Sequence, residues 1–206
     1  MTIAQPAKRK YTPQEYYRME RDSPVRHEYY DGEIFAMAGG TDEHSLIVAN
    51  IIGELRQRLK GSPCAVRDPN LRLKVKATGL RTYPDATVYC GEQERDTEQE
   101  SADTATNPTV LFEVLSKSTE AYDRGFKSDN YRRIESLKAY VLVSQESPHT
   151  ELYERQSDGS WRFTEFKGVN AVMSLPAINV VLPLAEIYDR IKFPESPSPF
   201  PRLEQA

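Results

Sequence analysis

The stretch Val110-Leu111-Phe112-Glu113-Val114-Leu115 is an apolar run with one carboxylate at its centre. Short apolar runs bounded by turn residues are typical of central β-strands that are covered on both faces. A carboxylate in such a strand is unfavourable unless it pairs with a cation or binds a metal ion. Glu113 is therefore either the partner of an arginine or part of a functional site.

A second carboxylate lies at the start of another short apolar run. Tyr83-Pro84-Asp85 leads into residues 85–89, which predict a second central strand. If the two strands are neighbours, Asp85 and Glu113 converge on one hard divalent cation, which prefers carboxylate, water and phosphate oxygens. The pair predicts a Mg²⁺ site, at which Mn²⁺ can substitute, of the kind found in phosphodiesterases.

The helix expected after the Glu113 strand carries a basic side chain toward the same cleft. Residues 118–136 predict this helix, and the apolar strand 139–143 follows it. Lys127 would orient or help to deprotonate the attacking water and offset charge on the phosphate. The alternative for Lys127 is a solvated helix charge. Lys117, in the turn before the helix, is a second candidate for this role, and Tyr131 lies on the same helical face as Lys127.

An acidic residue nearer the N-terminus is a candidate to assist. Asp31-Gly32 predicts a tight hairpin turn between strands 26–30 and 33–38, with Glu28 in the first strand. Glu28 supplies a further carboxylate, bonds to His44, or is simply a polar strand residue. The sequence leaves these three alternatives open.

A long helix is expected directly after that hairpin. Gly39-Gly40 ends the strand, and apolar residues then recur at four-residue spacing from Ile47 to Leu59. His44 falls in the first turn of this helix, where anions also bind favourably. It either holds a phosphate or a ligand carboxylate, or it is structural.

The remaining pattern indicates a mixed central sheet flanked by helices, of class α/β or α+β. Apolar and basic residues alternate over 71–76, which predicts a strand with one dry and one basic face. The acidic segment 91–107 has almost no apolar residue and is expected to be a solvated, mobile loop. Further elements are expected at residues 13–21 (helix), 64–67 (strand), 150–154 and 161–166 (hairpin) and 183–191 (helix).

The composition fits one globular domain. The chain has 206 residues, of which 38% are hydrophobic, and a formal net charge of −4. This acidity argues against a nucleic-acid coat protein, although a local basic cluster lies between Arg72 and Arg81. Cys64 and Cys90 lack zinc-binding spacing and are interpreted as buried thiols in strands. Without an apolar stretch long enough to cross a bilayer, a cytoplasmic protein with no membrane association is expected.

Several of these segments, in this order, resemble the PD-(D/E)XK restriction-endonuclease-like superfamily. Within it, the chain is similar to the Uma-type family of restriction endonucleases, often described as a domain of unknown function. The resemblance implies an αβββαβ core with extra strands, here with an additional C-terminal hairpin. The matching segments are Arg26-His27-Glu28-Tyr29-Tyr30-Asp31-Gly32-Glu33, residues 40–44, Tyr83-Pro84-Asp85, Phe112-Glu113-Val114-Leu115-Ser116, and Tyr122-Asp123-Arg124 through Lys127 to Tyr131.

Carried over position by position, the resemblance implies a metal site. Pro84-Asp85 matches the metal-binding PD pair, Glu113 matches the second acid, and Glu28 matches an early acidic residue. The main-chain carbonyl of Val114 would complete the coordination of Mg²⁺.

The chain departs from the family pattern at the catalytic lysine. The lysine is expected at Leu115, so the role passes to Lys127, as in members whose lysine has moved to the helix. The family usually has proline between two serines, where this chain has Ser116-Lys117-Ser118. Lys117 therefore remains the alternative candidate for the catalytic lysine.

The resemblance implies metal-dependent hydrolysis of DNA phosphodiester bonds. One rival is a catalytically inactive binding or regulatory module that kept the fold, which the overall acidity and the missing lysine favour. Another is a hydrolase for a different phosphoester. A homodimer is expected, because cutting both strands of a duplex needs two sites. The domain is expected over residues 12–192, between a flexible segment at 1–11 and a Pro-rich tail at 193–206.

Overall fold

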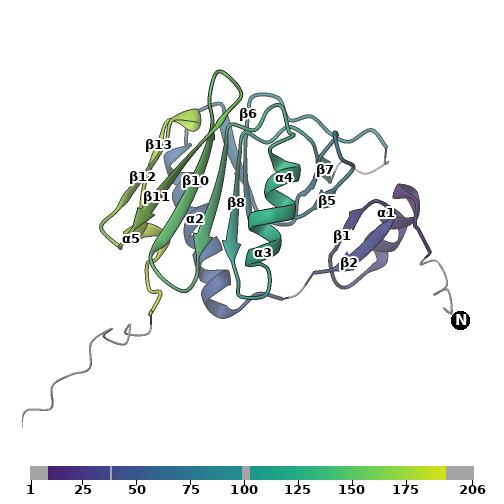
Figure 1. The fold of residues 1–206 in the computed structure, drawn as a ribbon, viewed down its shortest axis with the longest axis horizontal. Helices are drawn as coiled ribbons and strands as arrows, with labels where there is room; N and C mark the ends of the chain where they lie inside the picture. Colours follow the sequence, from purple (N-terminus) through teal and green to yellow (C-terminus); the bar gives the residue numbers. More distant parts are fainter. Residues whose placement is uncertain (1–8, 38, 99–102, 194–206) are drawn as a thin grey trace, which may run out of the picture.

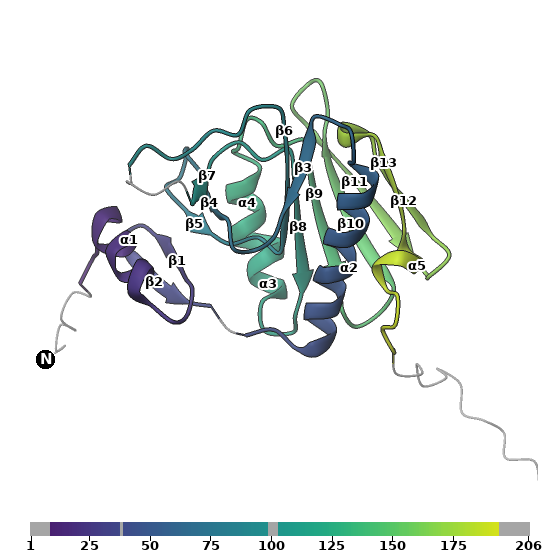
Figure 2. The same ribbon diagram turned by 180° about the vertical axis from the view of Figure 1, so that it is seen from behind.

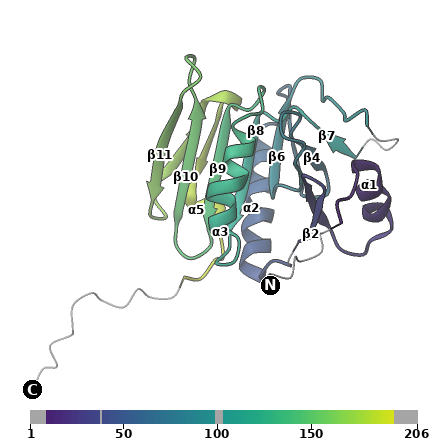
Figure 3. The ribbon, with the colours of Figure 1, turned by 45° about the vertical axis from the view of Figure 1, so that its right-hand side comes forward.

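The computed structural model describes residues 9–37, 39–98 and 103–193, and its centre is a six-stranded mixed sheet (Figure 1). Its strands, in spatial order, are β11 (Trp161–Lys167), β10 (His149–Arg155), β9 (Ala139–Ser144), β8 (Val110–Leu115), β6 (Ala86–Cys90) and β3 (Cys64–Arg67). β8 runs parallel to β9 and antiparallel to β6. Both apolar runs are central strands, as predicted, and they are also neighbours, which was the condition for Asp85 and Glu113 to converge (Figure 3).

Helices cover both faces of this sheet, which confirms the predicted α/β class (Figures 1 and 2). On one face lies α2 (Asp42–Arg58). Val110, Phe112 and Val114 point to this face and pack in the hydrophobic core between the sheet and α2. On the other face lies a continuous helical segment composed of α3 (Glu120–Tyr122), a π-turn (Asp123–Lys127) and α4 (Ser128–Tyr131). Because side chains alternate along a strand, Glu113 points to this second face.

The helix after β8 is shorter than predicted, since it ends at Tyr131 and not near residue 136. The guanidinium of Arg155 donates hydrogen bonds to the carbonyl oxygens of Arg132 and Ile134. These carbonyls are thereby satisfied without a further helical turn. The helix also contains the π-turn, a feature that often occurs at functional sites.

A smaller sheet with one helix forms the N-terminal edge of the molecule. Its spatial order is β2 (Glu33–Ala36), β1 (His27–Tyr30), β5 (Arg81–Thr82), β4 (Arg72–Lys74) and β7 (Thr104–Ala105), with α1 (Pro13–Asp22) beside β1. Thr12 and Glu15 form a capping box at the start of α1. The backbone N–H of Tyr11 donates to the carbonyl of Gly32, so residue 11 packs on the hairpin. Residues 1–8 of the expected flexible segment lie outside the described residues.

The strand predicted at 71–76, with one apolar and one basic face, is present as β4, but its basic face is buried at Arg72 and Lys74. Arg72 and Lys74 are only 5% and 8% exposed. The Nζ of Lys74 lies 2.9 Å from Asp96 Oδ1 and 2.8 Å from Glu98 Oε1. Burial of these cations requires counter-charges, and the acidic segment supplies them.

The acidic segment was expected to be a solvated loop. Its described parts, residues 91–98 and 103–107, are partly buried instead. β7 pairs in parallel with β4, and Asp96 is 8% exposed. The local basic cluster is thereby neutralised and does not form a free basic surface.

The two cysteines are not thiols, which corrects the prediction. Cys64 in β3 and Cys90 in β6 lie directly opposite each other in the antiparallel register and form a disulfide. Spacing along the chain gave no sign of this, because the pair is 26 residues apart and meets only when the two strands align.

The C-terminal region contains the predicted hairpin β10–β11 and a second hairpin that was not predicted. The second consists of β12 (Val172–Leu175), a 3₁₀ turn (Pro176–Ile178) and β13 (Val180–Pro183). The helix expected at 183–191 is only α5 (Leu184–Ile187). The side-chain amide of Asn50 caps the carbonyls of Ile187 and Asp189, and Arg190 has a φ of +62°, which ends the helix.

The last described residue, Phe193, packs against the core of the main sheet, and the Pro-rich tail after it lies outside the described residues. Across the described part of the chain, no helix is long and apolar enough to span a bilayer.

Candidate active site

A cavity of about 700 Å³ opens where the pairing between β6 and β8 ends. The last paired residues are Ala86 and Phe112. Asp85, one residue earlier, leaves the ladder, and its Oδ2 accepts a hydrogen bond of 2.7 Å from the backbone N–H of Val114. The N–H and C=O of one strand residue point to the same side, so the Val114 carbonyl also faces the cavity, where it contacts the imidazole of His44.

The deepest carboxylate of the cavity is Glu113, whose side chain is 3% exposed. Its Oε1 accepts a hydrogen bond of 2.7 Å from the hydroxyl of Tyr131 and lies 3.2 Å from Lys127 Nζ. The same ammonium group lies 3.0 Å from Asp123 Oδ1 and 3.5 Å from Glu28 Oε1. One buried lysine is therefore shared by three carboxylates from β8, the π-turn and β1.

Glu28 is held in place by hydroxyl groups. Its Oε2 accepts a hydrogen bond of 2.7 Å from Tyr122, and its Oε1 accepts one from Thr82 of β5. The hairpin β1–β2 thereby docks onto the helical segment across the cavity.

His44 enters from the first turn of α2. The hydroxyl of Thr41 caps the helix by accepting from the backbone N–H of His44 at 3.1 Å. The imidazole Nε2 then lies 3.3 Å from Asp85 Oδ2. Asp85 is thus held between His44 and the Val114 amide.

The electrostatics of the site combine burial with like charges. Burial raises the pKa of Glu113 well above its ordinary value, and Asp123 and Asp85 raise it further against the opposing effect of Lys127. Burial also raises the pKa of Asp123.

The neighbouring carboxylates raise the pKa values of the two basic groups of the cavity, Lys127 and His44. Burial would lower the pKa of Lys127, but Glu113, Glu28 and Asp123 outweigh burial and raise it well above its ordinary value. Lys127 is therefore an ammonium at neutral pH. The hydrogen bond with Asp85 raises the pKa of His44.

The donor set suits a hard divalent cation. Four carboxylates line the cavity, namely Glu28, Asp85, Glu113 and Asp123, and they face one lysine and one histidine. Even with His44 protonated, an excess of two negative charges remains when all four acids are ionised. Such an excess in a buried site is unfavourable unless a cation binds or a carboxyl group holds its proton. Carboxylate and carbonyl oxygens are the ligands that Mg²⁺ prefers.

All of the predicted site residues line or face this single cavity: Glu28, His44, Asp85, Glu113, Val114 and Lys127. Lys117 does not, because its side chain is 82% exposed and pairs with Glu146 at 3.2 Å. Leu115, at the family lysine position, lies in the apolar core under α4. Sequence reasoning missed Asp123 as a site residue, although its position four residues before Lys127 on a helix is a usable signal.

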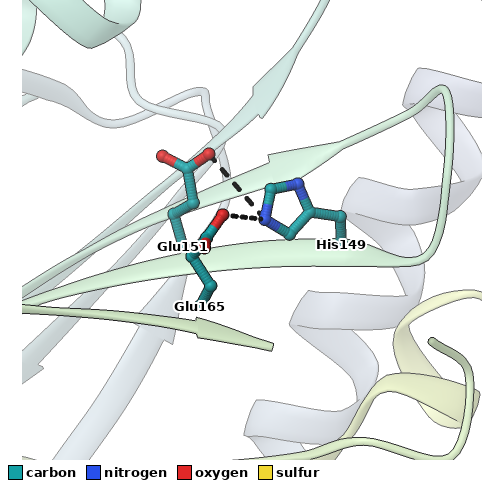
Figure 4. Close-up of side chains that lie close together, drawn as sticks. All are labelled: His149, Glu151 and Glu165. Carbon is teal, nitrogen blue, oxygen red and sulfur yellow. Dashed lines mark hydrogen bonds and ion pairs between the residues drawn. The ribbon is translucent and has the colours of Figure 1, made fainter. Parts of the chain in front are cut away.

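A second group of possible metal ligands lies on the outer strands β10 and β11 (Figure 4). His149 Nε2 is 3.1 Å from Glu165 Oε1 and 3.9 Å from Glu151 Oε1. Each carboxylate here already has a cation: Arg124 donates to Glu151, and Lys167 lies 3.0 Å from Glu165. We call this group the outer cluster; each of its two carboxylates has a lysine or arginine beside it, and Arg124 also binds Glu120.

Comparison with known proteins shows the family of this chain. The Uma2 family model, described as "Putative restriction endonuclease", matches residues 13–185. The uncharacterized protein slr1290 of Synechocystis sp. is 34% identical over 184 residues, covering 89% of this chain and 94% of that protein. A second uncharacterized protein of the same organism, sll1609, is 29% identical over 160 residues, covering 78% of this chain and 89% of that protein.

A solved structure has the same fold. The crystal structure of "a putative nuclease belonging to DUF820" from Anabaena variabilis superposes with a TM-score of 0.68, over 85% of this chain and 96% of that chain. The sequence identity is 16%, so the likeness concerns the fold alone. The fold is the restriction-endonuclease-like fold that the sequence motifs implied.

Proposed function

The chain belongs to the Uma2 family of restriction-endonuclease-like proteins, and on that premise we propose that it is a Mg²⁺-dependent endonuclease that cuts DNA. The observation that carries the proposal is the buried excess of carboxylates around Lys127, at the point where β6 and β8 separate. Mn²⁺ is expected to replace Mg²⁺, since both accept oxygen ligands.

Each residue of the cavity has a role in this proposal. Asp85, Glu113 and the carbonyl of Val114 would hold the metal ion, which would supply Lewis-acid polarisation of the phosphate and a more acidic water. Lys127, whose ammonium form is favoured by the neighbouring carboxylates, orients the attacking water and offsets charge on the phosphate. Glu28 and His44 assist by fixing Lys127 and Asp85.

The helical lysine replaces the one missing from β8. A lysine at position 115 would come from the strand, but Leu115 is 5% exposed in the apolar core. Lys127 reaches Glu113 from the opposite helix instead, because the π-turn directs both Asp123 and Lys127 inward. The proposal includes a homodimer, in which two-fold symmetry would supply two such sites.

A plasmid-nicking assay with Mg²⁺ tests this proposal. Asp85→Asn keeps the shape of the side chain but removes the charge, and we expect nicking to fall by at least about a hundredfold. Glu165→Gln in the outer cluster is the matched control and should nick at the wild-type rate. Wild-type protein that binds DNA but never nicks it would contradict the proposal and support an inactive binding module.

A further inference from the structure

One wall of the cavity is aromatic and partly uncovered. Phe35 in β2 lies directly opposite Glu28 in β1, so both side chains project from the same face of the hairpin. Glu28 reaches the ammonium group of Lys127 in the cavity. Phe35, on the same face of the hairpin, also lines this cavity. The other face of the hairpin packs on α1, yet Phe35 remains 45% exposed.

Three further rings line the same cavity, namely those of Tyr30, Tyr122 and Phe126. Tyr122, whose hydroxyl binds Glu28, stacks on Phe126 with ring centroids 5.2 Å apart and planes inclined by 14°. Tyr30 meets Phe126 edge-on at 4.8 Å. We call Tyr30, Phe35, Tyr122 and Phe126 the aromatic wall; it runs from the carboxylates to the hairpin.

The cavity lacks the cations that hold duplex DNA by its backbone. Among the described residues that line it, Lys127 is the only lysine or arginine, and three carboxylates already bind its ammonium group. Proteins that bind duplex DNA place several lysines and arginines on phosphates. Aromatic side chains instead bind unpaired bases by stacking, with little dependence on sequence.

We propose that the aromatic wall binds one unpaired base of the strand that is cut, so that single-stranded or locally unpaired DNA is the substrate in place of continuous duplex. The inference rests on the proposed nuclease function. The base stacks on Phe35, and its neighbouring phosphate then lies toward Asp85 and Glu113. A volume of about 700 Å³ is within the range of pockets that enclose small ligands.

Fluorescence of 2-aminopurine tests base binding separately from cutting. A 12-nucleotide single strand with one 2-aminopurine is titrated with full-length protein in Ca²⁺ in place of Mg²⁺. We expect quenching on binding, and an affinity about tenfold weaker for Phe35→Ala. Phe163→Ala is the matched control, because Phe163 is 49% exposed on the outer strand β11, and it should bind like wild type.

Two comparisons decide the outcome. Equal affinity of Phe35→Ala and wild type, or equal affinity for the single strand and its perfect duplex, would overturn the inference. For a duplex with one mismatched 2-aminopurine, we expect an affinity between those for the single strand and for the perfect duplex, because the mismatched base unpairs more easily.

Cutting assays with Mg²⁺ separate the two proposals. If the protein cuts nothing while Phe35-dependent quenching persists, the nuclease proposal fails and the base-binding inference stands. If it cuts perfect duplex at the same rate as single strand, and Phe35→Ala cuts as fast as wild type, the inference fails and the nuclease proposal stands.

Discussion

The cavity and the outer cluster contain the same kinds of side chain but differ in charge balance. In the cavity, four carboxylates share Lys127 and His44. In the outer cluster, Glu151 and Glu165 have Arg124 and Lys167 in addition to His149. Arg124 and Lys127 belong to the same π-turn. The side chain of Lys127 lies in the cavity, and that of Arg124 lies in the outer cluster. From this difference we expect the cavity, where buried carboxylates share one lysine, to bind a cation, and the outer cluster to consist of structural ion pairs.

The largest expected effect comes from removing the lysine of the cavity. Lys127→Met leaves Glu113, Asp123 and Glu28 without their shared cation, and we expect a loss of about 3 kcal/mol or more in the free energy of unfolding. Urea denaturation in EDTA measures this loss. Lys167→Met removes the exposed cation of the outer cluster and should leave stability unchanged within error. Equal losses of unfolding free energy in Lys127→Met and Lys167→Met would contradict the difference between the cavity and the outer cluster.

A smaller effect is expected in the pH dependence of stability without metal. Because burial raises the pKa of Glu113 above the ordinary 4.5, the folded state holds this proton more tightly than the unfolded state. Stability should therefore fall as pH rises from about 4.5 through the raised pKa, by at most about 1.4 kcal/mol per unit of the shift. Urea denaturation in EDTA between pH 4.5 and 8 should show a weaker fall for Glu113→Gln. A slope identical to wild type would contradict this origin.

The smallest effect is expected from the histidine of the outer cluster. His149→Gln keeps a polar side chain beside Glu165 and leaves Arg124 on Glu151, so Mg²⁺-dependent nicking should stay within about twofold of wild type. A hundredfold loss of nicking would show that the outer cluster takes part in the reaction.

The sequence predicted the central elements of this fold because their patterns are local. The apolar run around Glu113, the Asp31-Gly32 turn and the spacing from Ile47 to Leu59 each depend only on nearby residues. The predicted elements there agree with the structure to within one or two residues. The resemblance to the restriction-endonuclease-like superfamily then implied the αβββαβ core to which they belong.

Features that depend on distant partners could not be predicted in this way. Arg72 looked like an exposed strand residue, yet it is buried because the chain returns with Asp103 some thirty residues later. Cys64 and Cys90 pair only through the β3–β6 register. Asp123 was named within a motif but not as a site residue: its four-residue spacing to Lys127 was visible in the sequence, whereas the π-turn that buries both side chains was not.

The most direct test of the central claim is a calorimetric titration of Mn²⁺ into wild type, Glu113→Gln and Glu165→Gln. If the unbalanced cavity is the cation site, wild type and Glu165→Gln bind one ion with the same affinity, and Glu113→Gln loses the binding heat. The account is contradicted if wild type takes up no ion, or if binding is retained in Glu113→Gln and lost in Glu165→Gln.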